Sequence, residues 1–326
     1  MKTFRDAAAA LLGIFGAAVV GFTSVPATSY FAYQAGVQAP QKAVQFEIRM
    51  NAKGERFPLP FETLNGVPVF RVDVNGQQVW AMLDNGVSSS LLDKGFAQSQ
   101  NLPLGPVTSK LRTPSGALDR QLVHNITVQV PGQLRFTSPF SAVDLAFLKA
   151  ATGRPITLVL GKEYFDVLAV LVRPSSSSLE LGPSGRLNVP AAVRAIPLTS
   201  ERPNVEVRMG GKALNLMIDL GYNGDIALTP QAWDALSLNK RPATFGKGAN
   251  LNGSVYDVKF VKLPSVGIGP MTVNNVSASL RPLRAEDGDG ILGLGVLRRF
   301  DFALDVKARK LWLIDLKDKP TKPLGN

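Results

Sequence analysis

The chain of 326 residues contains no cysteine and a single histidine, His124. Without cysteine it has no disulfide bridges, no thiol nucleophile and no zinc site built on cysteine. A Ser-His-Asp triad would have to use His124, which lies in the alternating stretch LVHNITVQV, and we expect that histidine to be structural. Hydrolysis by carboxylates is among the few catalytic routes that this composition leaves.

The chain also lacks any run of five or six basic residues, although its net charge is +11. The charge is spread over both halves, so we interpret it as general solubility or attraction to anionic surfaces and expect no nucleic-acid partner. Hydrophobic residues make up 45% and charged residues 19% of the chain, a balance typical of a globular protein with a substantial core.

Residues 1–27 have the pattern of an export signal. Lys2 and Arg5 precede an apolar stretch over 7–22, and small residues at 25–27 offer a cleavage site. An uncleaved anchor in the inner membrane is the alternative, but the apolar stretch is short for a span of roughly 20 residues. We therefore expect an exported protein, periplasmic or secreted, with membrane association at the N-terminus if the signal stays uncleaved.

One sequence pattern occurs twice and organises the chain. In the stretch WAMLDNGVSSSLL an apolar run is followed directly by Asp84-Asn85-Gly86. In LNLMIDLGYNGDIAL, 135 positions later, an apolar run is again followed by Asp219-Leu220-Gly221. Each turn is preceded by a predicted β-hairpin, with Asn75-Gly76 between 67–74 and 77–83, and Gly210-Gly211 between 205–209 and 213–218. Short helices are predicted after each turn, at 93–98 and 230–236.

The repeat continues downstream. LVLGKEYFDVLAVLV at 158–172 corresponds to ILGLGVLRRFDFALDV at 291–306, which pairs Gly161 with Gly293 at an offset of 132. Pairing Phe165-Asp166 with Phe300-Asp301 restores the offset of 135 and requires a short insertion in the second copy. Two copies of one unit explain these matches.

These residues resemble the retropepsin-like aspartic peptidases in the two-lobed arrangement of pepsin, in which each lobe gives one catalytic aspartate. The resemblance covers about 57–316 and implies a mainly β fold of two tandem, pseudo-twofold-related acid-protease-like β-barrel lobes with few short helices. We expect a linker at 28–56, a first lobe at 57–185, a second lobe at 186–320 and a tail at 321–326; turn residues at 183–190 mark the boundary between the lobes.

The resemblance also implies the site. Asp84 and Asp219 would form a dyad that shares one proton and activates a water, because two carboxylates about 3 Å apart do not both ionise. Gly86 and Gly221 would permit the turn geometry. Two glycine-bearing hairpins are the flap candidates that would cover a peptide or protein substrate, with Ser115 and Gly116 in the first and Asn252 and Gly253 in the second. The family needs no metal or organic cofactor, and we expect a monomer because one chain supplies both lobes.

The middle residue of each turn departs from the family pattern, which has threonine or serine there. Asn85 retains a hydrogen-bond donor and acceptor, whereas Leu220 has neither. The alternative hypothesis is therefore a catalytically inactive relative that binds peptides or an envelope partner. A structural β module unrelated to peptidases is a third interpretation, but it would leave the repeat unexplained.

Overall fold

The computed structural model describes residues 47–50, 57–113, 116–200, 202–249, 255–281, 283 and 288–315. The predicted export signal lies outside these residues. Within the segment expected to be a linker, β1 (Glu47–Met50) is a strand that pairs antiparallel with the first lobe. In these described ranges, no helix is both long enough and apolar enough to span a membrane.

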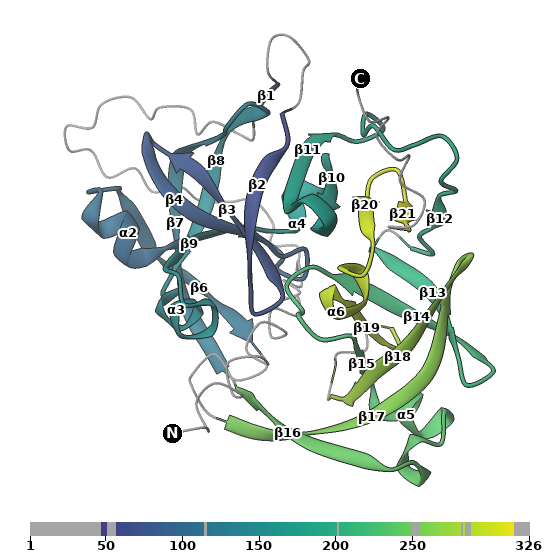
Figure 1. Cartoon of the computed structure of the whole chain (residues 1–326). Coiled ribbons are helices and arrows are strands. Elements are labelled where there is room, and N and C mark those ends of the chain that lie inside the picture. The colour runs from purple at the N-terminus through teal and green to yellow at the C-terminus, as the bar shows by residue number, and fades with distance from the viewer. Residues whose placement is uncertain are drawn as a thin grey trace, which may run out of the picture.

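Short strands dominate both halves of the chain, as the sequence predicted (Figure 1). The elements of the first lobe are β2 (Leu59–Leu64), β3 (Val67–Val74), β4 (Gln77–Leu83), β5 (Leu91–Asp93), α2 (Lys94–Ser99), β6 (Leu104–Thr113), β7 (Gly116–Val130), β8 (Leu134–Val143), α3 (Ala146–Thr152), β9 (Ile156–Leu160), α4 (Lys162–Phe165), β10 (Leu168–Arg173), η2 (Pro174–Ser176) and β11 (Ser178–Pro183).

The second lobe repeats this order of strands, without a counterpart of α3 among the described residues. Its elements are β12 (Ile196–Pro197), β13 (Asn204–Met209), β14 (Lys212–Asp219), β15 (Ile226–Leu228), α5 (Pro230–Ala235), η3 (Leu238–Lys240), β16 (Ala243–Ala249), β17 (Val255–Ile268), β18 (Met271–Leu280), β19 (Gly290–Gly293), α6 (Leu294–Leu297), β20 (Asp301–Asp305) and β21 (Lys310–Ile314).

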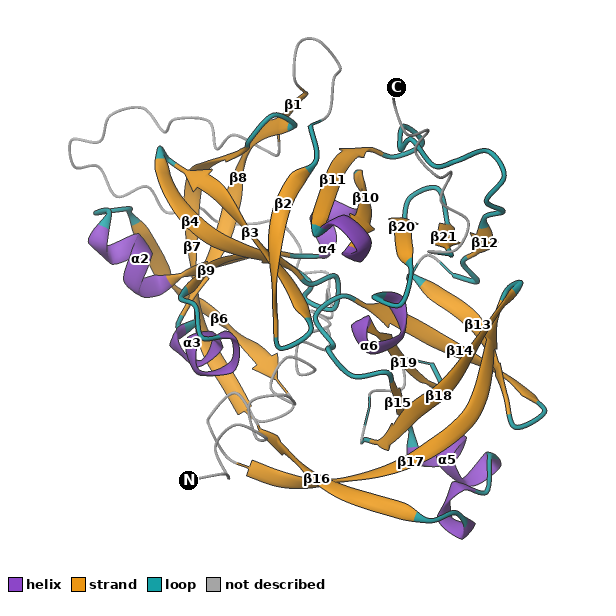
Figure 2. Ribbon diagram, viewed as in Figure 1, coloured by secondary structure: helices purple, strands orange, loops and turns teal. Residues whose placement is uncertain are grey.

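Each lobe contains a closed barrel with the same strand order (Figure 2). In the first lobe the order is β3-β4-β9-β5-β8-β7, and β7 pairs back with β3. In the second it is β13-β14-β19-β15-β18-β17, and β17 pairs back with β13. Closure pairs both outer strands of each sheet and so leaves no free edge within the barrel. The two-lobed fold implied by the repeat is confirmed.

The predicted hairpins and short helices form where the sequence places them. Asn75 and Gly76 have φ of 49° and 86°, and Gly210 and Gly211 have φ of 55° and 77°, the left-handed conformations that two-residue hairpin turns require. The helix α2 begins after Asp93, whose carboxylate accepts the Phe96 N–H at 2.8 Å. Thr229 and Pro230 begin α5 in the same way.

Six further strands join the lobes, in the order β12-β21-β20-β10-β11-β2, and β2 continues this sheet into the first barrel by pairing with β3. At its centre β10 pairs antiparallel with β20, and Leu171 lies opposite Ala303. These two residues occupy equivalent positions of the two lobes, 132 residues apart. The same offset relates Val170 to Phe302 and Val172 to Leu304, so it converts the pair Val170–Leu304 into the pair Val172–Phe302. The pseudo-twofold axis therefore passes between Leu171 and Ala303.

This symmetry corrects one sequence alignment. Phe165 ends the helix α4, whereas Phe300 follows α6 and directly precedes β20. The offset of 132 holds from Gly161 and Gly293, which cap α4 and α6 with matching backbone angles, through to β10 and β20. No insertion is needed, and the shared Phe-Asp dipeptide is a coincidence.

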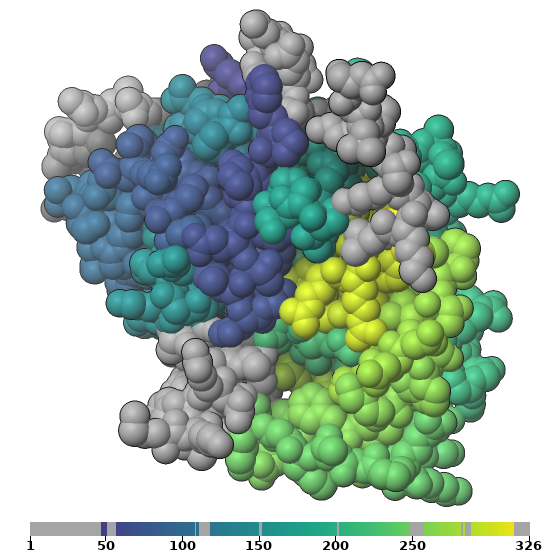
Figure 3. Space-filling model, in the orientation of Figure 1, coloured from purple at the N-terminus to yellow at the C-terminus, as the bar shows by residue number. Residues whose placement is uncertain are grey.

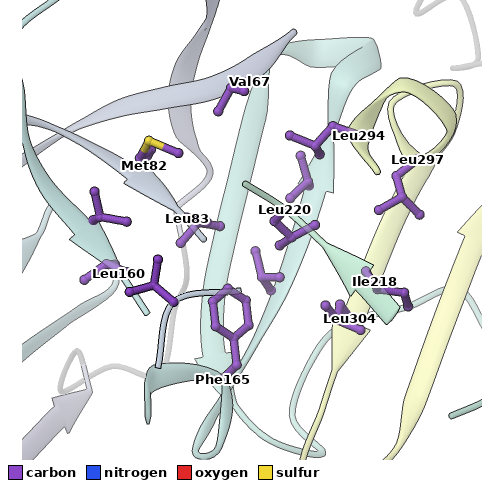
Figure 4. Packing of buried hydrophobic residues seen from close by; sticks show 14 of the residues in the cluster. Val67, Met82, Leu83, Leu160, Phe165, Ile218, Leu220, Leu294, Leu297 and Leu304 are labelled. Atoms are coloured by element: carbon purple, nitrogen blue, oxygen red, sulfur yellow. The ribbon is translucent and has the colours of Figure 1, made fainter. Parts of the chain in front are cut away.

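The lobes also share one apolar core. A continuous cluster of buried side chains includes Leu83 and Leu160 from the first lobe and Leu220 and Leu294 from the second. Figure 4 shows these side chains close together at the junction. In Figure 3 the C-terminal segment, drawn in yellow, lies directly against the first lobe. Because burial of shared apolar surface is the main stabilising term, we infer that the lobes fold as one unit.

Two buried aspartates of β20 add polar contacts between the lobes. Asp301 accepts hydrogen bonds from the Ser175 N–H at 3.1 Å and the Ser175 hydroxyl at 2.8 Å. Asp305 accepts from the Ser184 hydroxyl and the Gly185 N–H, both at 2.7 Å. Both carboxylates thus satisfy donors in turns of the first lobe that would otherwise be left unpaired.

We predict that Asp305→Ala lowers the free energy of unfolding by about 2 to 3 kcal/mol, because the Ser184 hydroxyl and the N–H groups of Gly185 and Ala308 lose a buried carboxylate acceptor. Denaturant unfolding of both proteins measures this. Asp257→Ala is the matched control, since Asp257 forms an exposed ion pair with Lys247, and it should cost less than about 1 kcal/mol. Equal losses in the two variants would contradict the role given to Asp305.

Candidate active site

The two Asp-x-Gly turns are delivered by equivalent strand pairs. In the first lobe β4 pairs in parallel with β9, and the Asp84 N–H donates to the Leu160 carbonyl at 3.0 Å. In the second, β14 pairs in parallel with β19, which places Asp219 opposite Gly293. Each aspartate therefore leaves its barrel beside an apolar-apolar-Gly strand, and both do so at the junction between the lobes.

The carboxyl groups have matching hydrogen bonds. The Gly86 N–H donates to Asp84 Oδ1 at 2.9 Å, and the Gly221 N–H donates to Asp219 Oδ1 at 2.8 Å. The exposed fraction is 0% for Asp84 and 1% for Asp219. Such burial is costly for carboxylates, so two of them in one place call for a specific explanation.

The two turns face each other across the lobe junction. A Cβ atom placed on Gly221 would overlap all three terminal atoms of the Asp84 carboxyl group. Only glycine can occupy that position without displacing the carboxyl group, because any side chain would take its space. The structure thus brings Asp84 and the Asp219 turn together, as the sequence predicted.

Burial raises the pKa of the Asp84 carboxyl well above its usual range, and the neighbouring Asp219 carboxyl raises it further. Hydrogen bonds from the backbone N–H groups of Gly86 and Val87 act in the opposite direction but are outweighed. A buried carboxyl beside a second one retains its proton to higher pH, which is the electrostatic behaviour of a pair that holds one proton between them.

Asn85 holds the opposite turn from both sides. Its Nδ2 donates to the Ile218 carbonyl at 2.6 Å, and its Oδ1 accepts from the Leu220 N–H at 2.9 Å. The carbonyl requires a donor and the N–H requires an acceptor, so these two partners fix the orientation of the amide. Ile218 and Leu220 flank Asp219, and one buried side chain of the first lobe therefore fixes the backbone on either side of the second aspartate.

Leu220 occupies the equivalent position in the second turn, but its side chain packs in the apolar core and cannot form hydrogen bonds. Its side chain is 2% exposed and belongs to the apolar cluster at the lobe junction, with Leu83, Leu294 and Leu297 (Figure 4). It offers no donor to the Leu83 carbonyl and no acceptor to the Asn85 N–H, the groups that symmetry places opposite it. The hydrogen bonds between the turns are made by Asn85, while Leu220 contributes packing.

Sequence reasoning missed one carboxylate beside the first turn. Glu163, in α4, accepts a hydrogen bond from the Ser90 N–H, at the end of the loop that follows Asp84-Asn85-Gly86. Burial raises the pKa of Glu163 above its ordinary value of 4.5. No sequence signal marks it, because its partner lies 73 residues away and is a backbone group.

The flap candidates are placed only in part. Gly116 opens β7 and pairs with Thr113 of β6, while Ser115, Asn252 and Gly253 lie outside the described residues. Strands β16 and β17 flank the second candidate turn, so a long hairpin is present in each lobe. Figure 1 shows both hairpins on the side of the molecule away from β10 and β20.

Two other kinds of site considered from the sequence were a histidine-based triad and a metal site. His124 is an exposed residue of β7, the strand predicted from its alternating sequence. Across the described part of the chain, no group of three or more His, Asp or Glu side chains is arranged to hold a metal ion.

Comparison with known families agrees with this geometry. A family model described as aspartyl protease matches residues 70–164 and 205–296, once in each lobe. Each match contains most of the hairpin, the Asp-x-Gly turn and the apolar-apolar-Gly strand. The matches cover more than half of the chain, and the protein belongs to the aspartyl protease family as a two-lobed member. No curated protein matches the chain.

We predict that Asn85→Ala lowers the free energy of unfolding by about 2 to 4 kcal/mol, because the buried Ile218 carbonyl and Leu220 N–H lose their partner. Denaturant unfolding measures the loss. The matched control is Asn223→Ala, which removes a more exposed hydrogen bond between the lobes, from Asn223 Nδ2 to the Asn65 carbonyl at 3.1 Å. A loss no greater than that of the control would refute the bracing role of Asn85.

We also predict a pH-dependent stability difference for Asp84→Asn. The folded-state pKa of Asp84 is raised, so ionisation of Asp84 lowers the free energy of unfolding as the pH rises from about 3.8 through the raised value. Asparagine keeps the Oδ1 acceptor but does not ionise. The stability of the variant relative to wild type should increase from pH 3 to pH 7, whereas a difference independent of pH would contradict a raised pKa.

Proposed function

We propose that the protein is an exported aspartic endopeptidase in which Asp84 and Asp219 together activate a water molecule. The observation that carries this proposal is the apposition of two buried carboxyl groups, one from each lobe, with the pKa of Asp84 raised. A buried pair that binds no substrate and does no chemistry would only destabilise the fold.

The chemistry follows from one proton held by two carboxyl groups. The ionised carboxylate takes a proton from the water as that water attacks the peptide carbonyl carbon. The protonated carboxyl group donates a hydrogen bond to the carbonyl oxygen, which gains negative charge in the tetrahedral intermediate. The carboxyl group that accepted the proton of the water then passes it to the leaving amine, the C–N bond breaks as the oxyanion re-forms the C=O bond, and the pair returns to its singly protonated state.

The substrate in this proposal is an extended segment of a peptide or protein, bound between the lobes. Both β6–β7 and β16–β17 offer strand edges to such a segment, which main-chain hydrogen bonds would hold in the manner of an added strand. Both aspartates come from one chain, so a monomer is sufficient for catalysis, with export directed by residues 1–27.

The alternative is a catalytically inactive protein that binds peptides in the same place. The observation that favours it is Leu220, which cannot make the hydrogen bonds of the family's hydroxyl residue. This alternative predicts peptide binding without cleavage at any pH, and Leu220→Thr would then be the substitution to test for gain of activity.

The test is cleavage of a diverse peptide library by the chain from residue 28, from acid to neutral pH. Asp84→Asn and Asp219→Asn should each reduce kcat/KM by at least about 1,000-fold, since both groups take part in one proton transfer. Asp144→Asn, which changes an exposed aspartate of the first lobe, should leave the rate unchanged. Full activity in either dyad variant would refute the assignment, and binding without cleavage by wild type would favour the inactive alternative.

A further inference from the structure

The loop that follows the first catalytic turn is fastened to the start of α4 by three hydrogen bonds. The Lys162 N–H donates to the Val87 carbonyl at 2.8 Å, and the Gly161 N–H donates to the Ser90 hydroxyl at 2.7 Å. The third runs the other way, from the Ser90 N–H to Glu163 Oε1. The same loop begins at Asp84, whose carbonyl accepts the Val87 N–H at 3.2 Å.

The start of α4 is also closely packed against this loop at Gly161. A Cβ on Gly161 would lie 2.8 Å from the Ser89 carbonyl carbon, 2.9 Å from the Ser90 nitrogen and 3.0 Å from Glu163 Oε2. No space remains between helix and loop, so a change at the Glu163 carboxylate is transmitted to the backbone of Ser89 and Ser90.

In the second lobe, the loop after the Asp-x-Gly turn is held by a different arrangement of charged groups. Its residue equivalent to Ser90 is Asp225, and its residue equivalent to Glu163 is Gly295. Asp225 Oδ2 accepts from the Ser277 N–H at 2.8 Å and from Arg299 Nη2 at 3.0 Å. The carboxylate of the second lobe is therefore on the loop and is neutralised by an arginine.

Glu163 has no such cation among the described residues. The charged group that acts on it is Asp166, which raises its pKa after the larger effect of burial, and Lys162 of the same helix forms an ion pair with Asp166. From the loop, the Ser90 N–H and hydroxyl lower the pKa, and Tyr164 beside it is neutral because burial raises its own pKa. Burial, the largest of these effects, outweighs the hydrogen bonds and leaves the pKa of Glu163 above its ordinary value.

We propose that Glu163 is a positioning residue whose ionisation couples pH to the geometry of the loop that carries Asp84. The ionised carboxylate accepts the Ser90 N–H in a charge-assisted hydrogen bond, and protonation weakens that bond and loosens the loop. The kinetic consequence rests on the proposed peptidase function, whereas the coupling itself is a property of the fold.

The kinetic test compares Glu163→Gln with wild type over the pH profile of kcat and KM. Glutamine keeps an oxygen acceptor for Ser90 but mimics the protonated acid at every pH. The two proteins should cleave equally at low pH, and kcat of the variant should fall to about one tenth of wild type at higher pH, because small misplacements of reacting groups are costly. A variant-to-wild-type ratio that is constant across pH would overturn the proposal. Glu62→Gln, a surface change in β2, is the matched control.

The second test does not depend on turnover. The folded-state pKa of Glu163 is raised, so ionisation lowers the stability of wild type as the pH rises from about 4.5, and the stability of Glu163→Gln relative to wild type should increase over that range. This increase in a protein that cleaves nothing would refute the peptidase while supporting the change in protonation state of Glu163 on which the coupling depends. A flat difference in an active enzyme would overturn the coupling alone.

Asp166→Asn provides an independent variant if Glu163→Gln does not fold. Removing this negative charge lowers the pKa of Glu163, so the ionisation assigned to Glu163 should move to lower pH in both the rate and the stability profiles. Movement to higher pH would overturn the proposal.

Discussion

Two carboxyl groups buried at one point between the lobes are the constraint on which the rest of the structure depends. Burial and mutual repulsion oppose the ionisation of Asp84, so the surrounding backbone has to supply compensating contacts. Gly86 and Gly221 supply N–H groups and, at Gly221, the space for the opposing carboxyl. The barrels, the parallel strand pairs and the joining sheet together hold these two turns face to face.

The lobes are symmetric in backbone and asymmetric in side chains. Asn85 makes both hydrogen bonds that fix the turn of Asp219, whereas Leu220 extends the apolar core toward the first lobe. The loops behind the turns differ in the same way: the carboxylate of the first lobe has no cation partner within the described part of the chain, whereas that of the second lobe is bound to Arg299. Duplication fixed the architecture, and each copy then stabilised its turn with different chemistry.

The repeat made most of the fold predictable from sequence. The hairpins at Asn75-Gly76 and Gly210-Gly211 and the short helices follow from local patterns with clear physical causes, whereas the facing of Asp84 and Asp219 was implied by the repeat and the family resemblance. That Asn85 keeps a donor and an acceptor for a contact between the lobes could be read from the sequence, and the structure shows that contact. Its two partners and the role of Glu163 could not, because these partners are backbone groups far away in sequence, and backbone groups leave no sequence signal. The Phe165 and Phe300 alignment was wrong because a shared dipeptide was given more weight than the start of the helix.

The central claim, that Asp84 and Asp219 act as one electrostatic pair, is tested most directly by titrating the Asp84 carboxyl by NMR with ¹³C-labelled aspartate. The comparison is between wild type and Asp219→Asn. If the pair is coupled, the pKa of Asp84 falls when the second carboxyl is replaced by an amide and stays above its usual range because burial remains. An Asp84 pKa unchanged by the substitution would contradict the coupling, and with it the mechanism proposed for this site.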